Sequence, residues 1–154
     1  MKHFNFKQIA RGLTLVSLLA MFSFTFPFGG DSLEVFLNKK LVFRQFMHTD
    51  QSVKTVTINP AAEKQQLEIN YRHCGQVGKS RVLALKNLKN QVVQSWNFTD
   101  VNAKEASMVI NVQDIVKGMK KNEERVHLYY TSKEIPGGKL LADIVYQPQV
   151  VVAK

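Results

Sequence analysis

Residues 32–46 read SLEVFLNKKLVFRQF, and this stretch has the period of a β-hairpin. Leu33, Val35 and Leu37 alternate with polar neighbours, which is the pattern of a strand with one buried face. Residues 38–40 (Asn-Lys-Lys) then supply a polar turn, and a second apolar run follows them. The stretch therefore predicts two short antiparallel strands at the start of a β domain.

Short alternating runs of the same kind recur along the rest of the chain, each bounded by Gly, Pro or Asn. They fall at residues 53–59, 67–72, 80–87, 91–98, 107–112, 125–132 and 140–147, with a last edge strand expected at 149–154. Runs at this spacing are typical of a sandwich or a barrel. The sequence thus predicts an all-β fold, an antiparallel β-sandwich (immunoglobulin-like or similar) of about 7–8 strands. Residues 31–154 are expected to form this single domain.

One segment departs from the period of two. Val112, Ile115, Val116 and Met119 fall at positions i, i+3, i+4 and i+7, which is the spacing of an amphipathic helix. We therefore expect one short helix near residues 112–120, crossing from one sheet to the other.

The first thirty residues differ in kind from the rest. Three basic residues precede a charge-free apolar run from Leu13 to Phe28, and Gly29-Gly30 follows it. This order predicts an export signal in residues 1–30, and the run is shorter than the ~20 residues of a membrane-spanning helix. An uncleaved anchor is the alternative, because no A-x-A cleavage motif is present. The protein is expected in the periplasm, at the cell surface or in the medium.

The charge and the cysteine content exclude several classes of protein. Beyond residue 30 the chain has eighteen basic residues against twelve acidic ones, a net charge of +6. The basic residues are scattered, whereas a nucleic-acid-binding surface gathers them on one face. Only one cysteine is present, so the domain is expected to fold without an internal disulfide.

Residues 71–80 read YRHCGQVGKS and end as a nucleotide-binding loop does, in Gly-Lys-Ser. The full motif requires a glycine five positions before Gly78, where His73 stands, and a helix after the loop. We therefore expect no nucleoside triphosphate site. Residues 74–79 are instead predicted to connect two antiparallel strands, with Gly75 and Gly78 taking positive φ angles.

The histidines and the single cysteine offer a second chemistry. Strand parity turns His73 inward and Cys74 outward. Both are suitable ligands for copper or zinc, with His48 or His127 as further ligands, although no pair has the spacing of a known metal motif. A nucleophilic cysteine also needs a positioned base, which no spacing identifies. The alternative for Cys74 is simple packing at a strand end.

Two further contacts are candidates for ligand binding. Lys79 and Arg81, next to glycine amides, are expected to hold an anion such as a carboxylate or sulfate. Trp96 and Phe98 share one strand face and form a candidate stacking platform for a glycan or peptide. The alternative is that both rings belong to a second buried face or to the contact with an adjoining partner, and use in the core is the commoner case.

Three stretches carry a resemblance: SLEVFLNKKLVFRQF (32–46), YRHCGQVGKSRVLALKN (71–87) and LYYTSKEIPGGKLLA (128–142). They resemble a group of small exported proteins of Bacteroidetes-type bacteria, which share a strand–Asn-Lys–strand opening and an HCG…GK.R segment. The group has no assigned activity, so the resemblance implies export and a small β domain and transfers no functional residue.

The expected function is that of an exported, non-enzymatic binding or envelope-structural module. The sequence contains no informative carboxylate pair, nucleophile motif or cofactor loop, so neither catalysis nor a cofactor is expected. An envelope protein, a peptide or a glycan is the expected class of partner. The alternative is a metal- or thiol-handling extracytoplasmic protein that uses His73 and Cys74.

Overall fold

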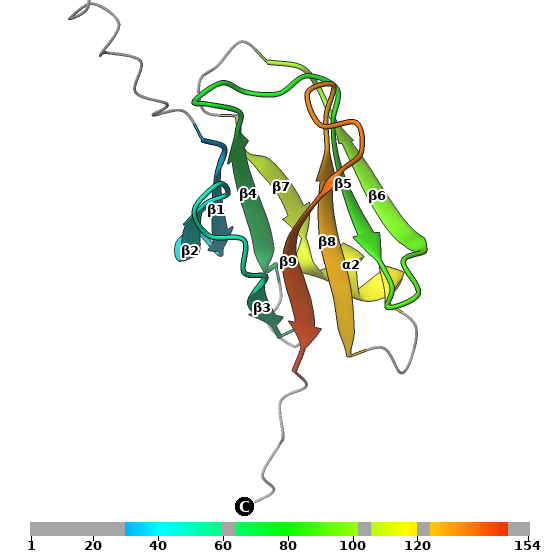
Figure 1. Cartoon of the computed structure of the whole chain (residues 1–154). Coiled ribbons are helices and arrows are strands. Elements are labelled where there is room, and N and C mark those ends of the chain that lie inside the picture. The colour runs from blue at the N-terminus through cyan, green and yellow to red at the C-terminus, as the bar shows by residue number, and fades with distance from the viewer. Residues whose placement is uncertain (1–29, 60–63, 102–105, 120–123, 148–154) are drawn as a thin grey trace, which may run out of the picture.

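The computed structural model describes residues 30–59, 64–101, 106–119 and 124–147. Within these residues the chain is mostly β, with nine strands in two sheets and one short helix (Figure 1). The two sheets share one apolar core, which confirms the predicted β class and is consistent with a sandwich. The expected export signal and the expected edge strand at 149–154 lie outside the described residues.

The first sheet has four strands in the order β2-β1-β4-β7. They are β1 (Ser32–Leu37), β2 (Lys40–Phe46), β4 (Gln66–Arg72) and β7 (Met108–Asn111). The second sheet has five strands in the order β3-β9-β8-β5-β6. They are β3 (Lys54–Ile58), β5 (Arg81–Lys86), β6 (Val92–Phe98), β8 (Arg125–Thr131) and β9 (Lys139–Tyr146).

The hairpin predicted at the start of the domain is confirmed as β1 and β2. Asn38 and Lys39 form its two-residue turn with φ angles of 53° and 66°. Two consecutive positive φ angles are the mark of the turn whose twist matches paired strands, and asparagine tolerates that conformation well. The pairing shifts by one residue opposite Val35 and Phe36, which leaves a bulge at Val42.

The strand pairing differs from the expected antiparallel sandwich at one edge. After β2, at the edge of the first sheet, the chain crosses to the other sheet. There β3 pairs with β9 in parallel. Gln45 is buried and holds this crossing, since its side-chain amide donates to the carbonyl oxygens of Asp50 and Ser52 at 2.8 Å each. A period of two identifies a strand and its buried face, but it does not identify the neighbour or its direction.

Alternate residues of each central strand supply the core. In β4 these are Leu67, Ile69 and Tyr71, and in β8 the buried positions include Leu128 and Tyr130. Burial of a large apolar side chain contributes about 1.5–3 kcal/mol each. The inward parity predicted for the strand before His73 is therefore confirmed.

The predicted helix is α2 (Val112–Gly118), which links β7 of the first sheet to β8 of the second. Val112 and Ile115 are its buried residues, so the helix packs one apolar face on the end of the core. In the part of the chain that the structure describes, no helix has the length and apolar character needed to span a membrane.

Candidate functional site

The segment after β4 begins with a tight two-residue turn. The His73 and Gln76 backbones exchange two hydrogen bonds, with the His73 N–H donating at 2.8 Å and the Gln76 N–H donating at 2.9 Å. Cys74 and Gly75 form the tip, with φ angles of 49° and 84°. This geometry exposes Cys74 and leaves His73 directed toward the core. The positive φ angle expected at Gly75 is present.

The chain then crosses between the sheets, because β4 and β5 belong to different ones. The segment therefore does not join two paired antiparallel strands, and the positive φ angle expected at Gly78 is absent. Gly78 is required for another reason. A Cβ atom at this position would lie 2.7 Å from His73 Nε2 and 2.9 Å from Glu134 Oε2, and closer still to the Tyr130 hydroxyl. Only a residue without a side chain lets the backbone pass this close.

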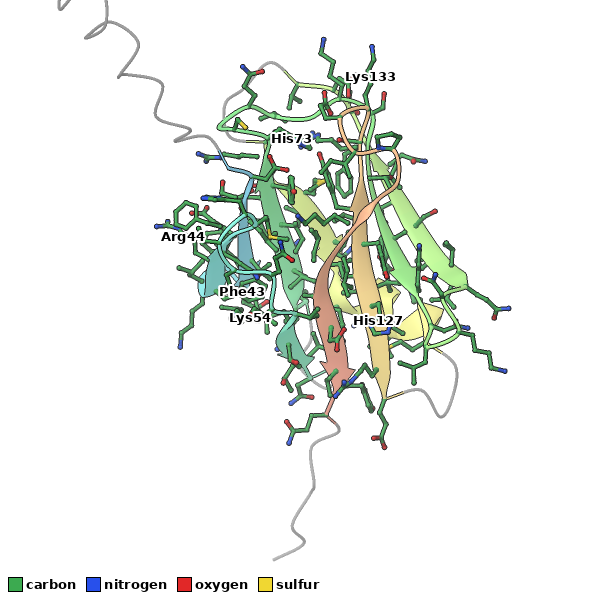
Figure 2. All side chains as sticks on the ribbon, in the orientation of Figure 1. Phe43, Arg44, Lys54, His73, His127 and Lys133 are labelled. Carbon is green, nitrogen blue, oxygen red and sulfur yellow. The ribbon has the colours of Figure 1, made fainter. Side chains whose placement is uncertain are left out.

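Beneath Gly78, polar side chains from both sheets gather around His73. Its Nε2 atom lies 3.1 Å from the Tyr130 hydroxyl and 3.2 Å from Ser132 Oγ. Its Nδ1 atom lies 3.7 Å from Asp31 Oδ2, which also accepts a 2.7 Å hydrogen bond from the Tyr71 hydroxyl. We call these five residues the His73 cluster. Figure 2 shows His73 near Lys133, at one end of the two sheets.

The two tyrosines of the cluster stack on each other across the core. Their ring centroids are 4.6 Å apart and the rings are inclined by 22°. Burial raises the pKa of Tyr71, and the hydrogen bond to Asp31 raises it further. Burial also raises the pKa of Tyr130, against smaller opposing effects of Ser132 and Arg81. Both hydroxyls therefore stay protonated and act as hydrogen-bonding groups within the core.

Glu134, in the connection between β8 and β9, closes the cluster from outside. The Lys79 N–H donates to both of its carboxylate oxygens, at 3.3 and 3.1 Å, and Oε2 lies 3.9 Å from His73 Nε2. Burial alone would raise the pKa of Glu134, but hydrogen bonding to Ser132 and to the Lys79 amide outweighs it and lowers that pKa. The Glu134 carboxylate thus accepts hydrogen bonds from the Lys79 amide, at the position where a bound anion was expected.

Arg81 and Lys79 differ in their exposure to solvent. Lys79 is exposed, whereas Arg81 is 3% exposed and its guanidinium donates to Ala106 O at 2.8 Å and Thr99 O at 3.0 Å. The buried cation therefore fastens the strand end after β6 to the segment that leads into β7. The structure does not present these two side chains as one anion contact.

Asp31, His73 and Ser132 have the residue types of a hydrolytic triad, but their contacts differ from those of a triad. Ser132 is 5% exposed, and its Oγ atom accepts a 3.3 Å hydrogen bond from the Ile135 N–H. The 3.7 Å separation of Asp31 and His73 exceeds hydrogen-bond length. The backbone of Gly78 passes close to His73, since a Cβ atom on it would lie 2.7 Å from His73 Nε2. The arrangement instead ties together three separate segments of the chain.

The four candidate metal ligands do not gather in one place. His73 faces the core, while Cys74 stands at the turn tip and His48 is exposed after β2. His127 Nδ1 lies 2.7 Å from Asp143 Oδ1, and Figure 2 places His127 toward the other end of the sheets from His73. Among the described residues, no three His, Cys, Asp or Glu side chains are arranged to hold a metal ion.

The two aromatic residues proposed as a platform are partly buried. Trp96 and Phe98 share one face of β6, as expected, and both rings pack against the apolar core. The rings therefore lie partly buried against the core on β6, the end strand of the second sheet, which is closer to the alternative than to an exposed platform.

Exposed apolar side chains lie on β2, the end strand of the first sheet. Leu41, Val42 and Phe46 are 44%, 43% and 54% exposed. Arg44 lies among them and forms a 2.6 Å ion pair with Glu34 of β1. We call Leu41, Val42, Arg44 and Phe46 the β2 edge.

Sequence reasoning missed most of the His73 cluster. Asp31, Tyr130 and Ser132 of the cluster, and Glu134 beside it, were not singled out. They lie 42 to 61 positions away from His73 along the chain. The only local signal was a polar Ser-Lys-Glu run directly after the apolar strand β8. This run marked the end of β8, but nothing in it indicated that the end of β8 would face the end of β4.

No protein-family model matches this chain, and no curated protein matches it either. The resemblance to small exported proteins of Bacteroidetes-type bacteria therefore stays a proposal, and no activity is carried over from it.

Proposed function

We propose that this protein is an exported, non-enzymatic binding module that engages a partner outside the cytoplasm through the β2 edge. The observation that carries the proposal is the exposure of Leu41, Val42 and Phe46 on a strand that has one neighbour in the described part of the chain. An end strand has a row of unpaired backbone groups, to which an extended segment of another protein can add as a further strand. Exposed apolar side chains on such a strand favour a protein partner.

We also propose that the fold is an immunoglobulin-like sandwich. The order β9-β8-β5-β6 matches the order of four strands in one sheet of a variable-type immunoglobulin domain, and a short helix precedes β8. This correspondence supports an immunoglobulin-like sandwich, an architecture common among binding domains outside cells.

The closed His73 cluster supports the non-enzymatic part. Ser132 and His73, the best candidates for a nucleophile and a base, contact one another inside the core and lie beneath Gly78. A side chain that attacks a substrate must be reachable by that substrate. The cluster is better suited to positioning loops than to chemistry.

The charge of the hairpin indicates the composition of the partner segment. Lys39 and Lys40 at the turn are exposed and basic, whereas Arg44 within the β2 edge is paired with Glu34. A segment that alternates apolar and acidic residues would complement both the apolar side chains and the charges.

Site-specific photo-crosslinking in the native cell tests the proposal. A photoreactive amino acid at position 46 should yield a discrete crosslinked envelope protein. The same amino acid at Leu88, which is 68% exposed in the turn between β5 and β6, should not. Identical products from both positions, or a protein that fractionates with the cytosol at full length, would contradict the proposal.

The alternative, a metal- or thiol-handling protein, has one observation in its favour. Cys74 is exposed at the tip of a tight turn, where a partner thiol or an external ligand can reach it. Metal analysis of protein purified without a histidine tag separates the two proposals. Stoichiometric copper or zinc that is lost on Cys74→Ser would favour the alternative.

A further inference from the structure

A polar groove of about 620 Å³ opens where β4 begins, where β7 ends and where α2 follows. It lies at the opposite end of β4 from the His73 cluster. Two lysines, three glutamines, an asparagine and an aspartate line it. Its volume is in the range of small-ligand sites, but such sites are usually apolar. The described lining residues are all polar or charged, which favours an occupant with hydrogen-bonding groups.

Backbone hydrogen bonds hold the walls of the groove in place. Gln66 pairs with Asn111 in the ladder between β4 and β7. The Val112 N–H donates to Gln65 O at 2.9 Å, and the Gln66 N–H donates to Asn38 Oδ1 at 2.9 Å. The amide side chains thus project from a fixed backbone, which reduces the entropy lost when a ligand binds.

The charges of the groove favour an acidic occupant. Among the described lining residues, two lysines stand against one aspartate, a net charge of +1. Lys117 hydrogen-bonds Asp114 at 3.0 Å, and this contact, with a further one from Asn111, lowers the pKa of Asp114. Because Lys117 compensates the aspartate, the charge of Lys64 is left for a ligand carboxylate.

Gln65 supplies the second observation. Its Oε1 atom is buried and has no hydrogen-bond partner among the described residues. A buried acceptor without a donor costs free energy, so native structures seldom leave one unsatisfied. Gln65 lines the groove, so rotation of its side-chain amide toward a ligand hydroxyl would give this acceptor the donor it lacks.

We propose that this groove binds an oligosaccharide that carries a carboxylate, a sugar of the uronic acid type. Sugar hydroxyls donate and accept at once, which matches side-chain amides that do the same. A carboxylate matches the positive charge of the described lining. The described lining residues include no aliphatic or aromatic side chain, which disfavours a lipid or an apolar peptide. This site is separate from the β2 edge, so each proposal can fail without the other.

Nuclear magnetic resonance titration of the full chain tests the inference with three probes. Trigalacturonate should shift the side-chain amide signals of Gln65, Gln66 and Asn111. The neutral trisaccharide galactotriose should bind more weakly at the same signals. Triglutamate, which has the charge without the hydroxyls, should leave them unmoved. Equal shifts with triglutamate would assign the groove to acidic peptides and overturn the inference, as would no shift with trigalacturonate.

Two substitutions separate the hydroxyl and carboxylate contacts. Gln65→Leu should weaken the binding of trigalacturonate by about tenfold, which is the equivalent of one hydrogen bond to a buried acceptor. Lys64→Gln should weaken trigalacturonate but not galactotriose. Gln51→Leu, an exposed position between β2 and β3, is the matched control and should change neither affinity. Unchanged trigalacturonate affinity in folded Gln65→Leu or Lys64→Gln protein would overturn the inference.

Discussion

Gly78→Ala should destabilise this fold more than any other alanine substitution of a glycine in the segment between β4 and β5. The added Cβ atom would lie 2.7 Å from His73 Nε2 and 2.9 Å from Glu134 Oε2, and closer still to the Tyr130 hydroxyl. Cβ atoms do not approach other heavy atoms this closely in folded proteins, so a neighbour must move.

The nearest neighbour, Tyr130, has little room to move. Tyr130 is fully buried and stacked on Tyr71, with 4.6 Å between ring centroids. Forcing an extra methyl group into packed surroundings costs about 1–3 kcal/mol. Displacing the Tyr130 hydroxyl from His73 removes a hydrogen bond that contributes about 0.5–1.5 kcal/mol. The free energy of unfolding should therefore fall by about 2–4 kcal/mol, or about 8–15 °C in melting temperature for a domain of this size.

Two other glycines are matched controls for the assay, which is thermal and urea unfolding followed by circular dichroism. Gly75→Ala meets no atom within 4 Å but requires a φ angle of 84°, so it should cost about 1–2 kcal/mol. Gly137→Ala meets no atom and has no positive φ angle, so it should stay within about 0.5 kcal/mol of the parent. If Gly78→Ala has the same melting temperature as Gly137→Ala, Gly78 does not pack on the His73 cluster and the reasoning is refuted.

Three further predictions test the surroundings of this cluster. The lowered pKa of Glu134 means that folding favours its charged form, so this stabilisation is full above the ordinary value of 4.5 and is lost as the pH falls through the lowered one. Glu134→Gln should therefore have a lower melting temperature than the parent at pH 7 and the same melting temperature near pH 2. A difference that persists at pH 2 would argue against the contact with the Lys79 amide. Cys74 should react stoichiometrically with a maleimide in the native protein, and Cys74→Ser should leave stability within about 0.5 kcal/mol, because the side chain is exposed; a thiol that reacts only after denaturation would contradict the exposed turn tip. Arg81→Lys should cost about 2–3 kcal/mol in urea unfolding, because one ammonium group cannot reproduce two guanidinium contacts to separate carbonyls; a neutral result would mean that these contacts contribute little.

Local patterns were sufficient for the elements of the described chain. Alternation in residues 32–46 predicted the β1–β2 hairpin, because a strand with one buried face repeats every two residues whatever its neighbours are. Asn38 and Lys39 marked the turn between them. The spacing of Val112 and Ile115 predicted α2 in the same way, because a helix turns its apolar face every 3.6 residues. Strand parity also turned His73 inward and Cys74 outward, as observed.

Only the tertiary structure decided which elements meet. Every strand presents the same N–H and C=O groups on both sides, so its own residues do not specify that β3 lies parallel to β9 or that β4 and β5 belong to different sheets. The His73 cluster exists only because the ends of β4 and β8 face each other across the core. Gly78 shows the same limit at a single residue. Its sequence context indicated backbone freedom in a turn, whereas its actual role, close passage over Tyr130, depends on a side chain 52 positions away in the other sheet.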